Sequence, residues 1–290
     1  MKNSFFFLSG LFLVANSFFS QNIDCQRKID SLISRINYLE SNAKSTANTR
    51  LLQAGLTTNL GMNFITPGQT KLIDKNGIGS CYSIGISLTK TFKNSPTIGF
   101  ATGLEFDFET NKYKTVDSLY YDFIGNKILG KSNAVDANGT FSLQERNQKS
   151  IYVSVPLMMV FRTSMIGNFR YFGKFGIRNS FQIKSSVNDY GVDVTNSTQQ
   201  VANVENNNFS SPGDMFFYKG SIGLSAGAEW KFLETTSLVA EVGYFYGITP
   251  LHLERKEANR TLYTLDNGTR TYFSNKANQN QLLFKVSILF

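Results

Sequence analysis

The sequence predicts an all-β fold: an eight-stranded antiparallel transmembrane β-barrel of the up-and-down type, preceded by a short N-terminal periplasmic helix. Beyond residue 50, apolar and polar residues alternate with a period of two, which is the pattern of strands with one polar and one apolar face. Aromatic residues make up 14% of the chain and only 5 residues are proline, a composition that favours strands. Short and long connections separate the alternating segments in strict turn, as in outer-membrane barrels.

Residues 1–20 have the pattern of a secretory signal peptide. Lys2 supplies a positive charge, and the apolar run from Phe5 to Ala15 is too short to span a bilayer. Cleavage is expected after Ser20, with the segment Ala15-Asn16-Ser17 as the alternative site. We therefore expect three parts: the signal peptide (1–20), a periplasmic amphipathic helix with a linker (21–50) and the barrel (51–290).

The segment 23–44 is predicted to be helical, because apolar residues recur there at alternating spacings of four and three. They are Cys25, Ile29, Leu32, Ile36, Leu39 and Ala43. The face formed by Ile29, Leu32, Ile36 and Leu39 has two interpretations. It serves oligomerisation or docks on a periplasmic or envelope protein partner, or it belongs to a linker helix lying on the barrel rim, since so short a helix is marginally stable alone.

Eight segments after residue 50 are predicted as strands. They are residues 52–65, 80–92, 97–108, 150–163, 168–184, 215–232, 236–248 and 280–290. Three connections are short (93–96, 164–167 and 233–235), and four are long (66–79, 109–149, 185–214 and 249–279). This alternation predicts short periplasmic turns and long extracellular loops, with both chain ends in the periplasm. Ten strands are an alternative, because residues 117–130 could extend a hairpin above the membrane.

The two faces of each segment differ in a way that favours a membrane barrel. In 97–108, large apolar residues alternate with glycine, alanine and acidic residues. Small residues suit a narrow interior, and an eight-stranded barrel has little room inside for so many aromatic rings. The apolar face is therefore expected to contact outer-membrane lipid, with interfacial aromatic residues at the strand ends. These are Phe64, Phe92, Phe108, Phe169, Trp230, Phe232, Tyr246 and Phe290.

Charged residues on the polar faces are expected to point into the lumen. They are Glu105, Asp107, Arg162, Arg170, Lys174, Arg178, Lys219, Glu229, Lys231, Glu241 and Lys285. Buried charges need partners, so one interpretation is a salt-bridge network that plugs the interior. The other is a narrow anion-preferring pore, because the basic residues of this set outnumber the acidic ones.

The sequence argues against several other classes of protein. The net charge is +8, but no basic run carries a nucleic-acid-binding motif, so no nucleic acid partner is expected. His252, the single histidine, lies in a long connection with no serine or aspartate at a matching spacing. Neither a catalytic triad nor a histidine metal site is therefore predicted. We expect no enzyme, cofactor or metal, and two unpaired thiols at Cys25 and Cys81.

The segment Tyr152-Val-Ser-Val-Pro156-Leu157, the aromatic strand that follows it and the last strand carry a family resemblance. They resemble strands of Bacteroidetes outer-membrane β-barrel proteins, the PorT-like group, over residues 51–290. Terminal Phe290 looks like the membrane-insertion signal read by the barrel-assembly machinery. The resemblance implies a place in the bacterial outer membrane and, for PorT itself, a role in protein secretion.

Together these features predict a non-enzymatic integral outer-membrane protein that acts as an envelope scaffold, presenting its loops or docking partners. One alternative is a small anion-preferring transport pore. Another is a component of a secretion or envelope-assembly complex that binds its partner through residues 21–50.

Overall fold

The computed structural model describes residues 31–35, 51–196, 200–210, 215–233, 235–252 and 256–290. The chain divides into two units, Met1–Arg50 and Leu51–Phe290. In the first unit, residues 31–35 are helical and exposed, and they include Leu32. The signal peptide, Cys25, and the helix-face residues Ile29, Ile36 and Leu39 lie outside the described residues. In the part of the chain that is described, no helix is long and apolar enough to cross a membrane.

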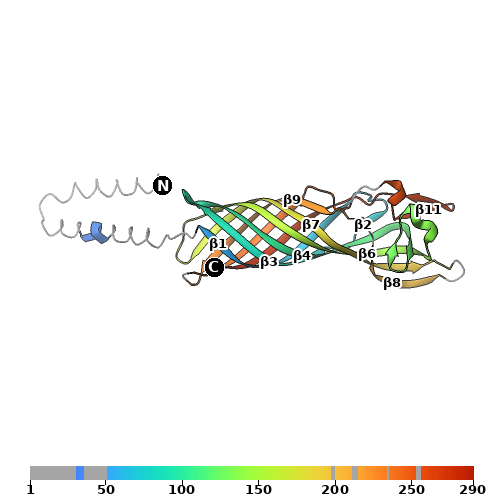
Figure 1. Cartoon of the computed structure of the whole chain (residues 1–290), viewed down its shortest axis with the longest axis horizontal. Helices are drawn as coiled ribbons and strands as arrows, with labels where there is room; N and C mark the ends of the chain where they lie inside the picture. Colours follow the sequence, from blue (N-terminus) through green and yellow to red (C-terminus); the bar gives the residue numbers. More distant parts are fainter. Residues whose placement is uncertain (1–30, 36–50, 197–199, 211–214, 234, 253–255) are drawn as a thin grey trace. The chain divides into compact units, whose positions relative to one another are not determined.

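The second unit is a closed antiparallel barrel whose strands cross its wall obliquely (Figure 1). Within its described residues, eight strands close the ring, each pairing with the next along the chain and the last pairing with the first. They are β1 (Leu52–Pro67), β3 (Gly79–Phe92), β4 (Ser95–Ile124), β6 (Gly139–Arg162), β7 (Phe169–Asp193), β9 (Tyr218–Lys231), β10 (Ser237–Gly247) and β13 (Ala277–Leu289). This up-and-down ring confirms the predicted fold class.

The two faces of the wall are sorted as the alternation predicted. Along β4, Leu104, Phe106 and Phe108 are 39%, 41% and 45% exposed, whereas the intervening Glu105 and Asp107 are 1% and 0% exposed. The apolar face therefore points outward and the polar face points into the lumen, the arrangement of a barrel whose outside is in lipid.

One irregularity in the wall has a clear chemical cause. The pairing of β4 with β6 is interrupted between Thr102↔Leu157 and Glu105↔Ser154. Pro156 lies in this gap and has no N–H group to donate to a neighbouring strand. The wall stays closed there because pairing resumes on both sides of the proline.

The barrel has a turn end, with the three short connections and the last strand's C-terminus, and a loop end. At the loop end, β4, β6 and β7 continue well beyond their predicted limits, and the prediction that 109–149 is a loop is wrong. Pairing of β4 with β6 runs on from Thr110↔Lys149 to Phe123↔Gly139. The predicted strands stopped too early because their outward residues become polar beyond the lipid-facing band, while backbone pairing does not depend on that polarity. Residues 117–130 thus extend a hairpin and add no strand to the ring.

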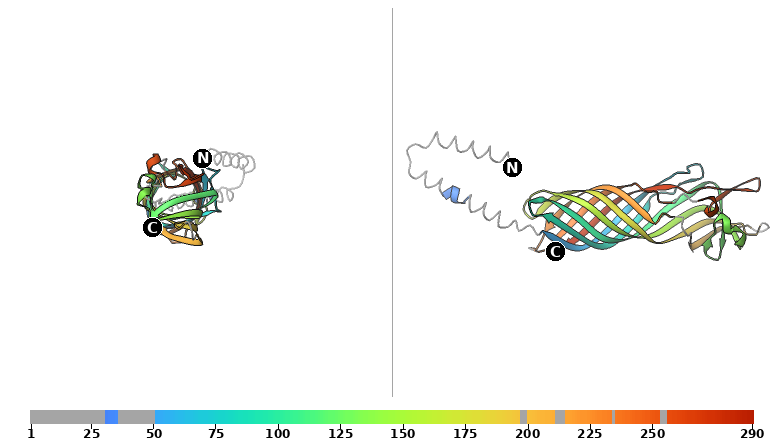
Figure 2. Two further views of the ribbon diagram at one scale, coloured as in Figure 1. Left: turned by 90° about the vertical axis from the view of Figure 1, so that its right-hand side faces the viewer. Right: turned by 45° about the horizontal axis from the view of Figure 1, so that its top comes forward.

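Beyond the level of Lys112 and Lys149, the four connections predicted as long loops build one structure at the loop end, which we call the cap: the described residues there of 66–79, 109–149, 185–214 and 249–279. Figure 2, left, looks onto this end. Besides the extended strands, the cap contains β2 (Ile73–Lys75), β5 (Lys127–Ile128), η1 (Lys131–Asp136), β8 (Val201–Phe209), η2 (Glu257–Asn259), β11 (Tyr263–Asp266) and β12 (Thr269–Tyr272). β8 pairs with β7, β2 and β5 pair with β4, and the β11–β12 hairpin joins β4 through Tyr263↔Tyr120.

The cap has a hydrophobic core of its own. Ile73, Tyr121, Val187 and Leu251 come from the four different connections and are buried in the same cluster. The rings of Tyr121 and Phe141, both 0% exposed, lie 5.3 Å apart between centroids. Burial of this kind is what stabilises a packed unit, so the connections form an ordered structure at the mouth of the lumen.

Candidate functional site

The centre of the lumen is organised around Arg178 on β7. Its side chain is 2% exposed, and its Nη2 atom lies 2.7 Å from each carboxylate oxygen of Asp107 and 2.8 Å from Oε2 of Glu105. Ser154 also donates a hydrogen bond to Asp107. Because a guanidinium group presents several donors in one plane, one arginine can hold carboxylates from two positions of β4, which β6 separates from β7 in the wall.

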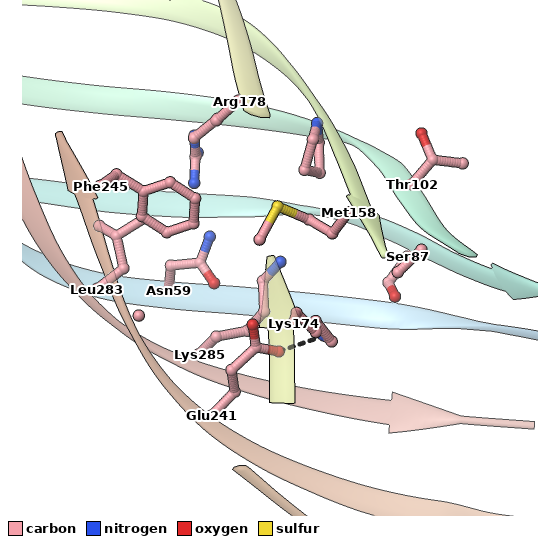
Figure 3. A pocket seen from close by; sticks show the side chains of 13 residues that line it. Asn59, Ser87, Thr102, Met158, Lys174, Arg178, Glu241, Phe245, Leu283 and Lys285 are labelled. Atoms are coloured by element: carbon pink, nitrogen blue, oxygen red, sulfur yellow. Dashed lines mark hydrogen bonds and ion pairs between the residues drawn. The ribbon is translucent and has the colours of Figure 1, made fainter. Parts of the chain in front are cut away.

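Two lysines extend this network around the ring. Lys285 of β13 pairs with Glu105, and Lys174 of β7 pairs with Glu241 of β10. Ser225 donates a further hydrogen bond of 2.6 Å to Glu241. Lys174, Arg178, Glu241 and Lys285 converge from β7, β10 and β13 around a cavity of about 30 Å³ (Figure 3), which has room for about one or two water molecules. The lumen at this level is therefore filled mainly by side chains.

A second cluster lies toward the turn end. Arg170 contacts Glu229 through Nε at 2.9 Å and Nη2 at 2.7 Å. The side chain of Gln53 accepts hydrogen bonds of 3.3 Å from Arg162 and Arg170, and donates one of 3.3 Å to Glu229. Arg162 also donates to the hydroxyl of Thr91 at 2.9 Å. Both arginines thus share the amide of Gln53, while Arg170 alone contacts the carboxylate of Glu229.

A third cluster lies toward the loop end. Lys219 pairs with Glu109, which also accepts hydrogen bonds of 2.9 Å from Gln279 and from Gln281. The ammonium group of Lys219 lies 4.5 Å from the ring centroid of Tyr152. Sequence reasoning missed Glu109 because the predicted strand ended at residue 108, although Glu109 continues the i, i+2 series of Glu105 and Asp107.

The structure brings together most of the charged residues predicted for the lumen. Ten of them take part in the three clusters: Glu105, Asp107, Arg162, Arg170, Lys174, Arg178, Lys219, Glu229, Glu241 and Lys285. Lys231 is half-buried at the end of β9 and makes no ion pair among the described residues. With Glu109 added, five carboxylates face six cations, and among these Arg162 alone has no carboxylate partner. The excess of basic groups is smaller than the sequence suggested.

The cap contains two further charged clusters that the sequence did not reveal. Asp122 accepts hydrogen bonds from Thr140 at 2.7 Å, Tyr263 at 2.9 Å and Arg270 at 2.5 Å. These contacts fasten the β11–β12 hairpin to β4 and β6. Burial, together with the neighbouring Asp122 carboxylate, raises the pKa of Tyr263 well above its ordinary value. Arg146 and Asp189 form a buried two-bond pair at 2.8 Å for each bond.

The remaining residues with reactive side chains are placed in packed surroundings. His252 is 2% exposed, and its Nε2 atom lies 2.8 Å from the hydroxyl of Tyr113. Cys81 is a buried free thiol on the lumen face of β3. Among the described residues, no group of acidic, histidine and cysteine side chains is arranged to hold a metal ion.

The aromatic residues expected at the membrane interfaces all lie on the outside. Phe64, Phe92, Phe108, Phe169, Trp230, Phe232, Tyr246 and Phe290 are each between 38% and 56% exposed. Phe169 and Trp230 stack across β7 and β9 with ring centroids 6.1 Å apart. Phe290 follows β13 at the turn end, and its role as an insertion signal stays a prediction.

A closed ring with an apolar outside, a charged and hydrogen-bonded inside, and alternating short and long connections defines a transmembrane β-barrel of the outer-membrane class. The model of the family described as "Outer membrane protein beta-barrel domain" matches residues 35–253. The chain belongs to this family, and its place is the bacterial outer membrane. No curated protein sequence matches it.

Solved structures with similarity to the chain include three outer-membrane proteins. OprG from Pseudomonas aeruginosa is 9% identical, with 82% of this chain and 93% of that chain covered and a TM-score of 0.40. Neisserial surface protein A is 10% identical, with coverage of 82% and 97% and a TM-score of 0.32. The outer membrane protease OmpT from Escherichia coli is 9% identical, with coverage of 84% and 97% and a TM-score of 0.35.

Proposed function

We propose that this protein is a non-conducting, non-enzymatic outer-membrane scaffold that presents its cap outside the cell as a folded surface for partners. The observation that carries the proposal is that paired charged side chains stand in the lumen at its centre and toward both of its ends. These are the three ion-pair clusters, and the packed core of the cap lies at the loop end. A surface with its own core is pre-organised for binding, since little ordering remains to oppose association.

Two features count against the alternatives. Five of the six lumen cations are already neutralised by carboxylates, which weakens the electrostatic basis for an anion-preferring pore. His252 is buried against Tyr113, so its imidazole is not offered to a substrate. A role in a secretion or assembly complex through residues 21–50 stays a prediction from the sequence, as does the narrower resemblance to PorT-like proteins of Bacteroidetes.

Conductance tests the first half of the proposal. The full chain is refolded, shown to be folded by its heat-dependent shift in gel mobility, and inserted into a planar bilayer. We expect no steady conductance steps. Steady steps with a preference for anions would overturn the scaffold proposal in favour of the transport pore.

Labelling of intact cells tests the second half. In a background with Cys25 and Cys81 replaced by serine, Val135→Cys places a thiol at a 94% exposed site of the cap. Lys93→Cys places the matched thiol at an exposed site of a turn-end connection. A membrane-impermeant maleimide should label the first and not the second in intact cells, and both after lysis. The reverse pattern would mean that the cap faces the periplasm.

A further inference from the structure

Three lysines form a diagonal row on the outward face of the barrel wall. Lys112 on β4, Lys149 on β6 and Lys184 on β7 are all exposed, and we call them the lysine row. Lys149 lies opposite Thr110, two residues from Lys112. Lys184 lies opposite Ile151, two residues from Lys149. Diagonal neighbours on paired strands are about 7–8 Å apart, so one phosphate group can contact two of these ammonium groups.

The lysine row lies at the upper edge of the lipid-facing band. On its turn-end side, Phe108 and Ile151 are direct partners across β4 and β6. On β7, Phe181 and Ile183 are 45% and 60% exposed. An apolar surface that gives way to lysines within two residues along a strand marks the level where acyl chains end and headgroups begin.

In the described part of the chain, none of the three lysines forms an ion pair. Glu109 and Asp189, on the same strands, point inward and are buried with Lys219 and Arg146. Lys112 lies opposite Asn147, so the outward Glu145 is a diagonal neighbour of Lys112, whereas Lys149 and Lys184 lie further from Glu145 toward the lipid.

The three lysines of the row stand together on one side of the barrel. Across the ring, the outward positions just beyond the lipid-facing Phe64 are Thr66 on β1 and its partner Asn278 on β13. Asn280, the partner of Phe64, is also uncharged. Three adjacent lysines over β4, β6 and β7, compared with Lys276 two residues beyond Asn278 on the β1–β13 side, favour binding at one place over general attraction to the whole rim.

We propose that the lysine row binds the phosphate-bearing headgroup of a membrane lipid, whose acyl chains lie on the apolar surface around Phe108, Ile151 and Ile183. The lysines supply charge to the phosphates, and the adjoining surface supplies contact to the chains. A lipid gains binding energy from both the lysines and the apolar surface, whereas free phosphate gains it from the lysines alone. The lysine row thus anchors one lipid at a defined position on the barrel.

The test measures lipid retention by the full chain. Protein is refolded in nanodiscs of phosphatidylcholine containing a minor fraction of bisphosphorylated lipid A, and retained lipids are counted by native mass spectrometry. The triple variant K112Q/K149Q/K184Q removes the lysine row. The matched triple variant K71Q/K90Q/K127Q makes the same change of charge at exposed lysines elsewhere. The heat-dependent gel shift shows that both variants fold.

We expect the row variant to retain lipid A about 100-fold more weakly than the wild type, and the matched variant to retain it normally. Equal retention by the row variant and the wild type, or equal loss in both variants, would overturn the proposal. A parallel arm offers inorganic phosphate to protein in pure phosphatidylcholine. Retention of free phosphate with an affinity equal to that for lipid A would show an anion site that does not require a lipid.

Discussion

Replacing Arg178 by methionine tests how the carboxylates at the centre of the lumen are compensated. The side chain is 2% exposed and lies within 2.8 Å of oxygens of both Asp107 and Glu105. Methionine keeps part of the apolar volume but has no charge, so Arg178→Met leaves a carboxylate without its cation in a low-dielectric interior. Removing one partner of a buried ion pair costs about 3–5 kcal/mol, and we expect the free energy of unfolding to fall by this amount.

The Arg178→Met substitution leaves Glu105 with more of its partners than Asp107. Glu105 keeps Lys285 and the amide of Asn59 at 3.1 Å, whereas the hydroxyl of Ser154 is the hydrogen bond left to Asp107 among the described contacts. Adding Asp107→Asn to Arg178→Met should therefore recover most of the loss, leaving a deficit of about 1–2 kcal/mol. Adding Glu105→Gln should recover little, because it removes the charge that Lys285 faces.

The free energy of unfolding is measured by urea titration of the protein in lipid vesicles. Fluorescence of Trp230, the single tryptophan, and the gel shift report unfolding independently. Lys231→Met serves as a control at the rim and should change stability by less than about 0.5 kcal/mol. The reasoning is refuted if Glu105→Gln restores the Arg178→Met variant as fully as Asp107→Asn does.

Two further predictions concern the cap. Tyr121→Ala removes a ring that is 0% exposed and should destabilise the cap by about 3–5 kcal/mol. The loss should appear as faster protease cleavage within the cap. The control Val135→Ala, at a 94% exposed site, should leave the rate of cleavage unchanged. The stability of the cap should also fall in alkali, because the pKa of Tyr263 is raised in the folded protein. The stabilisation that this group contributes is complete below about pH 10, the pKa of an unfolded tyrosine, and is lost progressively as the pH rises above that value toward the folded pKa. Tyrosinate absorbance and protease cleavage should rise together in the wild type, and this part of the pH dependence should disappear in Tyr263→Phe. Ionisation of Tyr263 without added cleavage would contradict the argument.

The strands of the ring could be predicted because their two faces meet different surroundings. Lipid outside and a narrow lumen inside impose the alternation that runs from Leu104 to Phe108. Beyond the acyl chains that contrast is lost, since the outward Lys112 and Lys114 are polar and exposed while the strand continues. The extensions of β6 and β7 were therefore missed, and that of β4 was anticipated only as the possible hairpin of residues 117–130.

The lumen residues were predictable as a set but not as pairs. Alternation assigns Arg178 and Asp107 to the inside, yet they stand on β7 and β4, which β6 separates. Which levels face each other across a ring depends on the tilt and stagger of its strands, and neither can be read from one segment. The core of the cap was missed for a related reason, because Ile73, Tyr121, Val187 and Leu251 come from connections far apart in sequence.

The pairing of β1 with β13 closes the ring and joins the two most distant strands of the barrel sequence. β1 pairs with β13 from Gly55↔Leu289 to Pro67↔Ala277, so the first strand of the ring waits for the last one before its second edge is satisfied. Contacts with so large a sequence separation form slowly, and an unpaired strand edge can join another chain in the meantime. We therefore expect closure to be the last step of folding and the one most exposed to aggregation, so a change that delays β13 should endanger the whole barrel.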